Sequence, residues 1–186
     1  MILTILVTAL VGCGEQAAPP AEVSTAVVAT QPSGEKLDRI DLDGLLRLVA
    51  EAKAEKQVLV FDFWATWCVP CVEMFGPLHD RLRALGKDVR LVSVTLDDPD
   101  TEGAALKFLQ DHQARKDAFM LIPDTDARFR AIAGIARQWN DLVVPAILIY
   151  DQTGNLASEF VTDPRVDDVL SRTRELLSTP SSVKQP

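Results

Sequence analysis

Two cysteines separated by two residues are the part of this sequence whose residue types and spacing indicate chemistry. Cys68 and Cys71 form a C-x-x-C pattern, with Trp67 before the first cysteine and Pro70 before the second. Cysteines one helical turn apart can bridge and can exchange disulfides with a partner. The pattern alone is a weak signal, so its meaning depends on the elements that hold it.

The cysteines stand between a predicted buried strand and a predicted helix. Residues 57–65 form an almost continuous apolar run, typical of a strand buried on both faces, and residues 72–85 carry apolar side chains at helical spacing. Cys68 therefore falls at a helix N-terminus, where unpaired N–H groups and the helix dipole stabilise a thiolate and lower the thiol pKa. We expect Cys68 to be the nucleophile and the more shielded Cys71 the resolving thiol. Pro70 fits the first helical turn because it lacks an N–H.

Three further residues could take part in this chemistry. Asp62 interrupts the apolar strand, and a buried charge is costly unless it has a task. A partly solvated aspartate at a strand end is the alternative interpretation. Trp67 offers a flat apolar surface to a peptide substrate, or else serves packing alone. Pro145 lies near the start of another apolar stretch, residues 143–150, where a proline is awkward for strand hydrogen bonding.

The rest of the domain alternates between strand-like and helix-like patterns from about residue 36 to residue 178. Further strands are predicted at 89–96, 118–122, 143–150 and 156–161, and further helices at 45–52, 101–113, 127–135 and 166–177. The turn at residues 151–155 joins the last two strands into a hairpin. The alternation predicts an α/β fold of three layers, with a mostly parallel mixed sheet and an antiparallel hairpin at one edge.

The segment from Asp62 to Cys71, DFWATWCVPC, resembles the active-site segment of the thioredoxin superfamily. The resemblance covers residues 36–177 and implies a thioredoxin-like α/β/α fold. It also implies that Asp62 helps to move the proton of the resolving cysteine. It further implies that the Val144–Pro145 bond is cis and lies beside the cysteines, and that Val144 binds an extended substrate through its backbone.

The stretch between Cys71 and Pro145 is longer than in minimal thioredoxin, with room for an inserted helix and short strand. With Trp139-Asn140 ahead of Val143, it is similar to the exported TlpA and ResA type proteins. That resemblance implies a protein-disulfide reductase that acts on exported proteins, including apocytochrome c, and needs no cofactor or metal. It also implies a membrane electron donor of the DsbD/CcdA type.

Three features depart from the family pattern. Pro77 comes one position later after the second cysteine than the usual helix proline, and Val69 stands where glycine is commoner. The predicted strand at 89–96 has no lysine to pair with the buried acid, as thioredoxin has. These departures leave the redox potential and the proton relay open, but not the disulfide exchange.

Other functions use the same fold or the same residues. A thiol oxidase or isomerase would need only a different redox potential. A copper-delivery protein would need a C-x-x-x-C and a distant histidine, whereas His79 is predicted to be solvated in mid-helix. A structural zinc site would need four ligands that the isolated His79 and His112 do not complete. A non-catalytic scaffold or a peroxidase has less support, because the Trp-Cys-x-Pro-Cys pattern is intact and no other cysteine setting is apparent.

The N-terminal region has the features of an export signal. Residues 1–13 form an apolar run that ends in Leu-Val-Gly-Cys and resembles the lipobox of bacterial lipoproteins, which implies a signal peptide and lipidation of Cys13. A plain cleaved signal or an uncleaved anchor is the alternative, since no basic residue precedes the run. Residues 14–35 are predicted to be a flexible linker and 179–186 a disordered tail. The predicted location is periplasmic, with a lipid tether to the membrane.

Composition excludes one class of partner. The 186-residue chain is 47% hydrophobic and 25% charged, as expected for a globular domain, and carries a net charge of −8 with a pI near 4.7. Nucleic-acid binding depends on clustered Lys and Arg, and the sequence has no basic run. We therefore expect protein partners and no nucleic acid.

Overall fold

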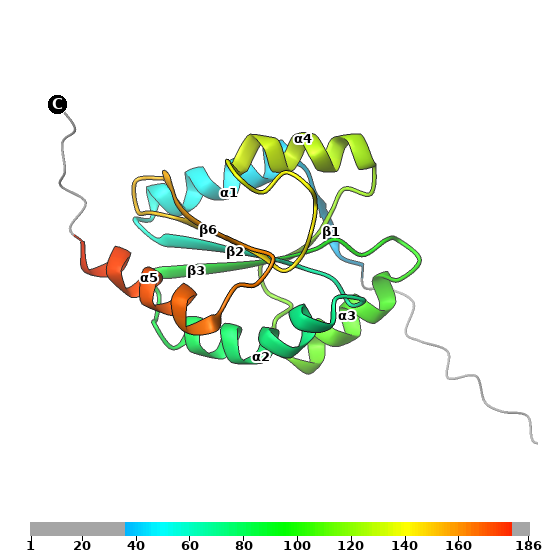
Figure 1. Cartoon of the computed structure of the whole chain (residues 1–186), viewed down its shortest axis with the longest axis horizontal. Coiled ribbons are helices and arrows are strands. Elements are labelled where there is room, and N and C mark those ends of the chain that lie inside the picture. The colour runs from blue at the N-terminus through cyan, green and yellow to red at the C-terminus, as the bar shows by residue number, and fades with distance from the viewer. Residues whose placement is uncertain (1–35, 180–186) are drawn as a thin grey trace, which may run out of the picture. The chain divides into compact units, whose positions relative to one another are not determined.

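The computed structural model of the protein describes residues 36–179, which form one six-stranded sheet flanked by five helices (Figure 1). The strands lie in the order β1-β4-β3-β2-β5-β6. Their bounds are β1 Asp38–Ile40, β2 Val58–Trp64, β3 Val89–Thr95, β4 Ala118–Leu121, β5 Ala146–Tyr150 and β6 Leu156–Val161.

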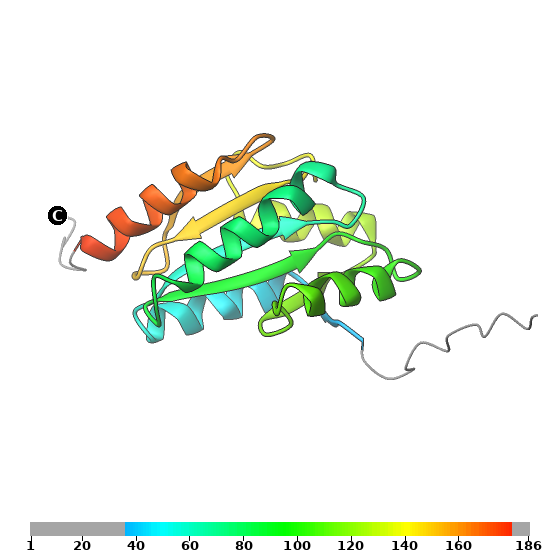
Figure 2. The same ribbon diagram turned by 90° about the horizontal axis from the view of Figure 1, so that it is seen from below.

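Helices cover both faces of the sheet, as Figures 1 and 2 show. One face is covered by α1 (Leu42–Ala54) and α4 (Thr125–Ile135). The other face is covered by α2 (Val69–Arg83), α3 (Glu102–Asp111) and α5 (Val166–Ser178). The predicted three-layer α/β/α arrangement is therefore confirmed.

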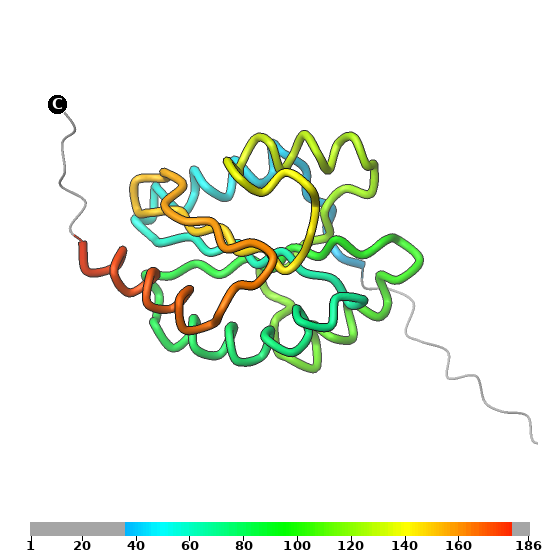
Figure 3. Tube along the Cα trace, in the orientation of Figure 1, coloured from blue at the N-terminus to red at the C-terminus, as the bar shows by residue number. Residues whose placement is uncertain are grey.

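The sheet is mixed in the predicted way. β1, β4, β3 and β2 pair in parallel, and β5 pairs with β2 and β6 in antiparallel fashion. The hairpin of β5 and β6 thus forms one edge. Between α2 and β5 the chain adds β3, α3, β4 and α4, after which a loop leads from α4 back to the sheet, as the Cα trace shows (Figure 3).

Strand β2 lies in the middle of the sheet, and all seven of its residues are buried. Because side chains alternate along a strand, Val58 and Val60 face α2 and α5, where they pack with Leu78, Leu82 and Leu170. Asp62 follows at the same spacing and so faces α2 as well. This alternation places a carboxylate in an apolar layer directly beneath the helix that begins at the cysteines.

Most bounds differ from the sequence-based expectation by a few residues, and three differences bear on the site or on the edge of the sheet. β1 was not predicted, because three residues with one buried side chain give no periodic signal. Its edge position is secured by Glu102, which accepts from the Leu37 N–H at 2.7 Å and pairs with Arg39 at 3.1 Å. α2 begins at Val69, three residues earlier than predicted. β5 begins at Ala146 rather than at residue 143, because Pro145 has no N–H for a ladder.

No helix within residues 36–179 is long and apolar enough to cross a membrane. The predicted signal peptide and lipobox (1–13), with Cys13, and the predicted linker (14–35) lie outside the described residues. The predicted tail lies there too, apart from Thr179.

Candidate active site

The C-x-x-C pair sits at the start of α2, as the sequence predicts. Cys68 is the N-cap of the helix, and its sulfur accepts from the Cys71 N–H at 3.3 Å. The two sulfur atoms form a disulfide of 2.02 Å, with the Cα atoms 5.2 Å apart. Cys68 is 5% exposed and Cys71 is 1% exposed. The first sulfur is therefore the one that a partner can reach more readily.

The residues next to Cys68 in the sequence have apolar side chains that are exposed to solvent. Trp67 is 62% exposed and Val69 is 66% exposed, and Pro70 beside them is also exposed. Large apolar side chains in water are unfavourable unless something covers them. Most of the Trp67 side chain is therefore open to contact with a partner.

The Val144–Pro145 peptide bond is cis, as the resemblance implies. In the ladder between β5 and β2, Ala146 is opposite Phe63, so Pro145 comes level with Trp64, close to the cysteines that follow β2. Val144 belongs to the same buried apolar cluster as Cys68 and Cys71. The proline loop and the disulfide therefore meet at the same end of the sheet.

The loop before Pro145 is fixed by polar contacts. The Trp139 indole N–H donates to the Val143 carbonyl at 2.8 Å, and the Val143 N–H donates to the Asp141 carboxylate at 3.1 Å. Leu142 has φ 59°, a left-handed conformation that is unfavourable for a branched side chain. The loop is thus held in one shape rather than left free.

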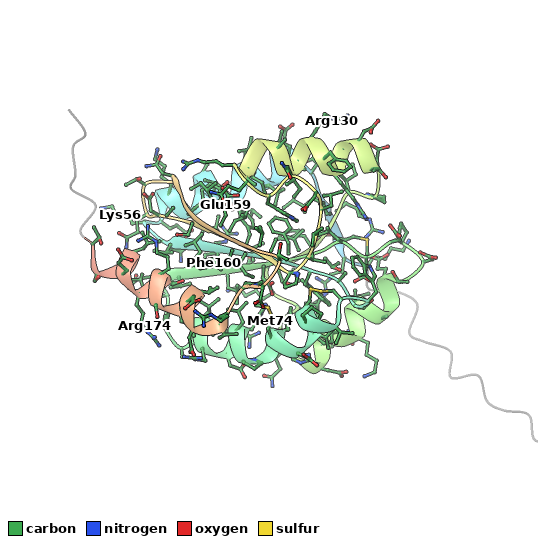
Figure 4. The ribbon with its side chains drawn as sticks, viewed as in Figure 1. Lys56, Met74, Arg130, Glu159, Phe160 and Arg174 are labelled. Carbon is green, nitrogen blue, oxygen red and sulfur yellow. A yellow bond between two sulfur atoms is a disulfide. The ribbon has the colours of Figure 1, made fainter. Side chains whose placement is uncertain are left out.

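Glu159 anchors the beginning of this loop. Its carboxylate accepts from three successive backbone N–H groups, those of Arg137, Gln138 and Trp139, at 2.9, 2.9 and 3.1 Å. Figure 4 shows Glu159 and Phe160 pointing to opposite faces of β6, with Glu159 on the side of α1 and α4. A carboxylate that accepts several N–H bonds forms a strong, charge-assisted clamp.

Asp62 is buried and paired with a histidine. Its side chain is 3% exposed, and its carboxylate oxygen lies 2.8 Å from Nε2 of His79, whose side chain is also 3% exposed. The His79 ring stacks on Phe75, with centroids 3.7 Å apart. Both the alternative of a solvated Asp62 and the prediction of a solvated His79 are wrong. His79 shares the inward face of α2 with Phe75 and Leu82, and so provides the partner that β3 lacks.

A second buried carboxylate fixes the turn that leads into the cysteines. Asp97, which is fully buried, accepts from the backbone N–H of Thr66 at 3.0 Å and from its hydroxyl at 2.6 Å. The hydroxyl of Thr95 donates to the same carboxylate. Arg128 reaches across from α4 to the carbonyls of Leu96 and Asp97 at 3.1 and 3.0 Å. The segment between β2 and Cys68 is therefore tied to the end of β3.

Within residues 36–179 there is no group of three or more His, Cys, Asp or Glu side chains that could hold a metal ion. His112, for example, is engaged elsewhere, with its Nδ1 2.9 Å from the Phe108 carbonyl.

Comparison with known proteins gives the family. Residues 34–159 match the sequence model of the AhpC/TSA family, which is more than half of the chain. The chain belongs to the AhpC/TSA family. It is 33% identical over 115 residues to the thiol:disulfide interchange protein DsbE homolog of Paracoccus denitrificans (strain Pd 1222). That match covers 62% of this chain and 56% of the relative, so it spans little more than half of the relative's length.

Two solved structures share the fold of this AhpC/TSA-family chain. A thiol:disulfide interchange protein of the thioredoxin family from Chlorobium tepidum TLS has a TM-score of 0.56 and 17% identity, and the match covers 69% of this chain and 84% of that one. A DsbF homologue from Corynebacterium diphtheriae has a TM-score of 0.56 and 21% identity, with 69% and 76% covered. The predicted thioredoxin-like fold is confirmed.

Sequence reasoning on this AhpC/TSA-family chain missed three polar residues that hold the site: His79, Asp97 and Glu159. Only His79 left a usable signal, because it follows Cys71 and Phe75 at intervals of four residues and so lies on the buried face of the helix. Asp97 and Glu159 act on segments about 20 to 31 residues away, which local patterns do not show.

Proposed function

We propose that this protein is an exported thiol–disulfide oxidoreductase that reduces disulfides in other proteins through Cys68 and Cys71. The observation that carries the proposal is the Cys68–Cys71 pair at the start of α2, level with the Val144–Pro145 bond. The name of the Paracoccus relative supports the same reaction class.

The reaction consists of two thiol–disulfide exchanges. The Cys68 thiolate attacks one sulfur of the substrate disulfide, forms a mixed disulfide and expels the first substrate thiolate. Cys71 then loses its proton and attacks the Cys68 sulfur, which releases the second substrate thiolate. Two electrons and two protons pass to the substrate, and the Cys68–Cys71 disulfide remains. A dithiol donor must reduce this disulfide again before the next cycle.

Each step has a structural basis in α2. Cys68 lies at the N-terminus of α2, where unpaired N–H groups favour negative charge, and the Cys71 N–H donates to its sulfur at 3.3 Å. Negative charge on that sulfur is therefore stabilised both in the free thiolate and when it is the leaving group. Cys71 is 1% exposed, so its sulfur is accessible to the Cys68 sulfur but shielded from oxidants in solution.

The surface beside the disulfide suits an extended apolar peptide. Trp67 and Val69 flank Cys68, and Val143, which is 44% exposed, precedes the proline loop. Val144 comes before the first paired residue of β5, so it stands outside the ladders of that strand. A substrate strand can therefore pair with its backbone by strand addition. In this proposal Pro70 and Pro145 line the same contact surface.

We place the substrates and the donor outside the cytoplasm. The proposal combines lipidation at Cys13 with a tether at residues 14–35, which would hold the domain near a membrane electron donor of the DsbD/CcdA type. The substrates would be exported protein disulfides, with apocytochrome c among them. The apolar run of residues 1–13, which ends at Cys13, is what supports exported substrates.

Trapping tests the proposal directly. In Cys71→Ser protein the second exchange is blocked, so we expect mixed disulfides with exported proteins to accumulate through Cys68. Cys68→Ser serves as the matched control and should trap none and reduce insulin no faster than the buffer thiol. Insulin reduction by Cys68→Ser at the wild-type rate would overturn the assignment of the nucleophile. A reduction potential near about −120 mV, typical of a strong oxidant, would overturn the direction.

A further inference from the structure

Asp62 is joined to a buried titratable group that the reaction above does not use. We propose that His79 is a positioning residue that acts through Asp62. It shares the proton that Asp62 takes from Cys71 and delivers it to a water-accessible pocket behind α2. The inference rests on the proposed function, because it concerns the proton of the resolving thiol.

Charge balance favours the pair over the lone acid as the proton acceptor. A carboxylate and a neutral imidazole together carry one negative charge in a layer where both side chains are 3% exposed. Uptake of one proton makes the pair neutral overall, either as carboxylate and imidazolium or as acid and imidazole. A buried net charge is unfavourable unless it is compensated. Transfer of the Cys71 proton to the pair removes that net charge and is therefore favoured.

The spacing along α2 requires Asp62 as the intermediate. Cys71 and His79 are eight residues apart on one face, which is about 12 Å along a helix. Phe75 lies between them in sequence and stacks on the His79 ring. Direct transfer from the thiol to the imidazole is therefore excluded by distance. Asp62 comes from β2 beneath this helix and contacts His79 at 2.8 Å.

The far side of His79 leads to solvent. His79 lines a pocket of about 690 Å³ whose walls include Leu82 and Ser93, whereas neither cysteine nor Asp62 lines it. Other lining residues, Gln57 and Val89, come from the starts of β2 and β3, at the end of the sheet opposite to the cysteines. The proton can therefore leave by a route that does not pass through the substrate surface.

Other polar and ionisable groups near His79 have their own partners or lie at the pocket. His112, the C-cap of α3, contacts Phe75 at a centroid distance of 5.4 Å and bonds to a backbone carbonyl. From β3, Ser93 accepts from the Trp64 indole. From α5 the buried polar group is Thr173, which donates to the Val169 carbonyl. The charged residues that share the pocket are Glu51, Glu55, Arg83, Lys87, Arg90, Lys116 and Asp117.

Protons and electrons balance when Cys71 releases the substrate from the mixed disulfide. Cys71 gives its proton to the Asp62–His79 pair, and the resulting thiolate attacks the Cys68 sulfur. The S–S bond between Cys68 and the substrate breaks, and the Cys68–Cys71 bond forms. The expelled substrate thiolate takes a proton from water, while the pair returns its proton to water at the pocket. No further oxidant or reductant is needed.

The test separates the two exchanges in the full-length protein. The probe is a synthetic peptide with one internal disulfide, mixed with the reduced protein in stopped flow from pH 6 to pH 9. The first exchange is measured in the Cys71→Ser background, and the second by release of the free peptide. His79→Asn keeps a hydrogen bond to Asp62 but cannot take up a proton. His112→Asn is the matched control at the other histidine.

We expect His79→Asn to slow resolution roughly 10-fold at pH 7, less than the roughly 100-fold or more of a complete general acid–base contribution, because Asp62 stays in place. The deficit should shrink toward pH 9, because a free cysteine thiol ionises near about pH 8.5 without help. The first exchange and the His112→Asn protein should stay within about two-fold of wild type. Wild-type resolution kinetics in His79→Asn across this range would overturn the inference and leave the oxidoreductase proposal standing. A wild-type protein that fails to form the mixed disulfide would overturn the oxidoreductase proposal instead.

A second measurement does not depend on variants or turnover. In protein labelled with ¹⁵N-histidine, the imidazole signals of His79 should follow different pH profiles in the oxidised and reduced states, while those of His112 stay the same. Identical His79 profiles in both states would overturn the inference even if His79→Asn did not fold.

Discussion

Two buried aspartates flank the active-site segment, and their partners differ in kind. Asp62 is bonded to an imidazole, which can gain or lose a proton. Asp97 is bonded to the Thr66 N–H and to threonine hydroxyls, which keep their protons at physiological pH. Burial alone therefore does not determine the role of a carboxylate. The partner decides whether the group exchanges protons or fixes geometry.

The largest effect should come from removing the geometric carboxylate. Asp97→Ala leaves the part-buried N–H and hydroxyl of Thr66 and the buried hydroxyl of Thr95 without their acceptor, so we expect the free energy of unfolding to fall by about 3 kcal/mol. Urea unfolding at pH 7 measures this change. Asp98→Ala is the control, since its exposed side chain pairs with Arg128 at 3.4 Å and its loss should cost less than about 0.5 kcal/mol. Equal losses in the two variants would contradict the role given to Asp97.

Asp62→Asn should give the opposite profile. The amide keeps a hydrogen bond to His79, so we expect a stability change below about 1 kcal/mol. The release of substrate from the mixed disulfide should slow about 10-fold at pH 7, equivalent to about 1.4 kcal/mol in the barrier. Asp97→Asn, measured alongside by the same stopped-flow assay, should change that rate much less. A rate loss of equal size in both amides would remove the distinction between the two carboxylates.

Glu159 should behave like Asp97, because its partners are also groups that keep their protons. Glu159→Gln removes the charge from a clamp on three N–H groups, and we expect about 1 kcal/mol lower stability. We also expect a higher KM for peptide disulfides with kcat nearly unchanged, since the clamp holds the loop that leads to Val144. A kcat loss without a KM change would instead give Glu159 a part in the chemistry.

Tyr150 extends the comparison to a buried group whose hydrogen-bond partner is a backbone carbonyl. Its hydroxyl donates to the Ile135 carbonyl, and burial, followed by the negative charge of Glu159, raises the pKa of Tyr150 to about 12. Because this pKa is raised on folding, the stabilisation is complete below pH 10 and is lost as the pH rises to 12. The loss should stay under about 0.5 kcal/mol at pH 10. In Tyr150→Phe, the free energy of unfolding, measured from urea unfolding curves, should fall less steeply with pH above pH 10.

The sequence predicted those features whose cause is local. The apolar run of β2, the helix after Cys68 and the hairpin after β5 each follow from periodicity or turn residues within a few positions. The cis bond at Pro145 followed from the family pattern rather than from physics. β1 escaped prediction, since its strand character comes from pairing with β4 and not from its three residues.

The polar supports of the site could not be predicted in the same way. Asp97 meets Thr66 only because parallel pairing brings the ends of β2 and β3 together. Glu159 meets its loop only through the fold of the β5–β6 hairpin. The pairing of His79 with Asp62 needed the packing of α2 on β2, although the helical spacing already placed His79 on the buried face. Charge complementarity across elements is a tertiary property.

The exposure of Trp67 gives the protein a built-in optical signal. Trp67 directly precedes the disulfide-bonded Cys68 and is open to water, whereas Trp64 and Trp139 are enclosed in the core. Light emission from an indole is weakened by a neighbouring disulfide and shifts to shorter wavelength when water is displaced from the ring. Reduction of the disulfide should therefore raise the fluorescence intensity of Trp67, and binding of a polypeptide should shift its emission to shorter wavelength. One fluorescence experiment can thus follow both events without a label.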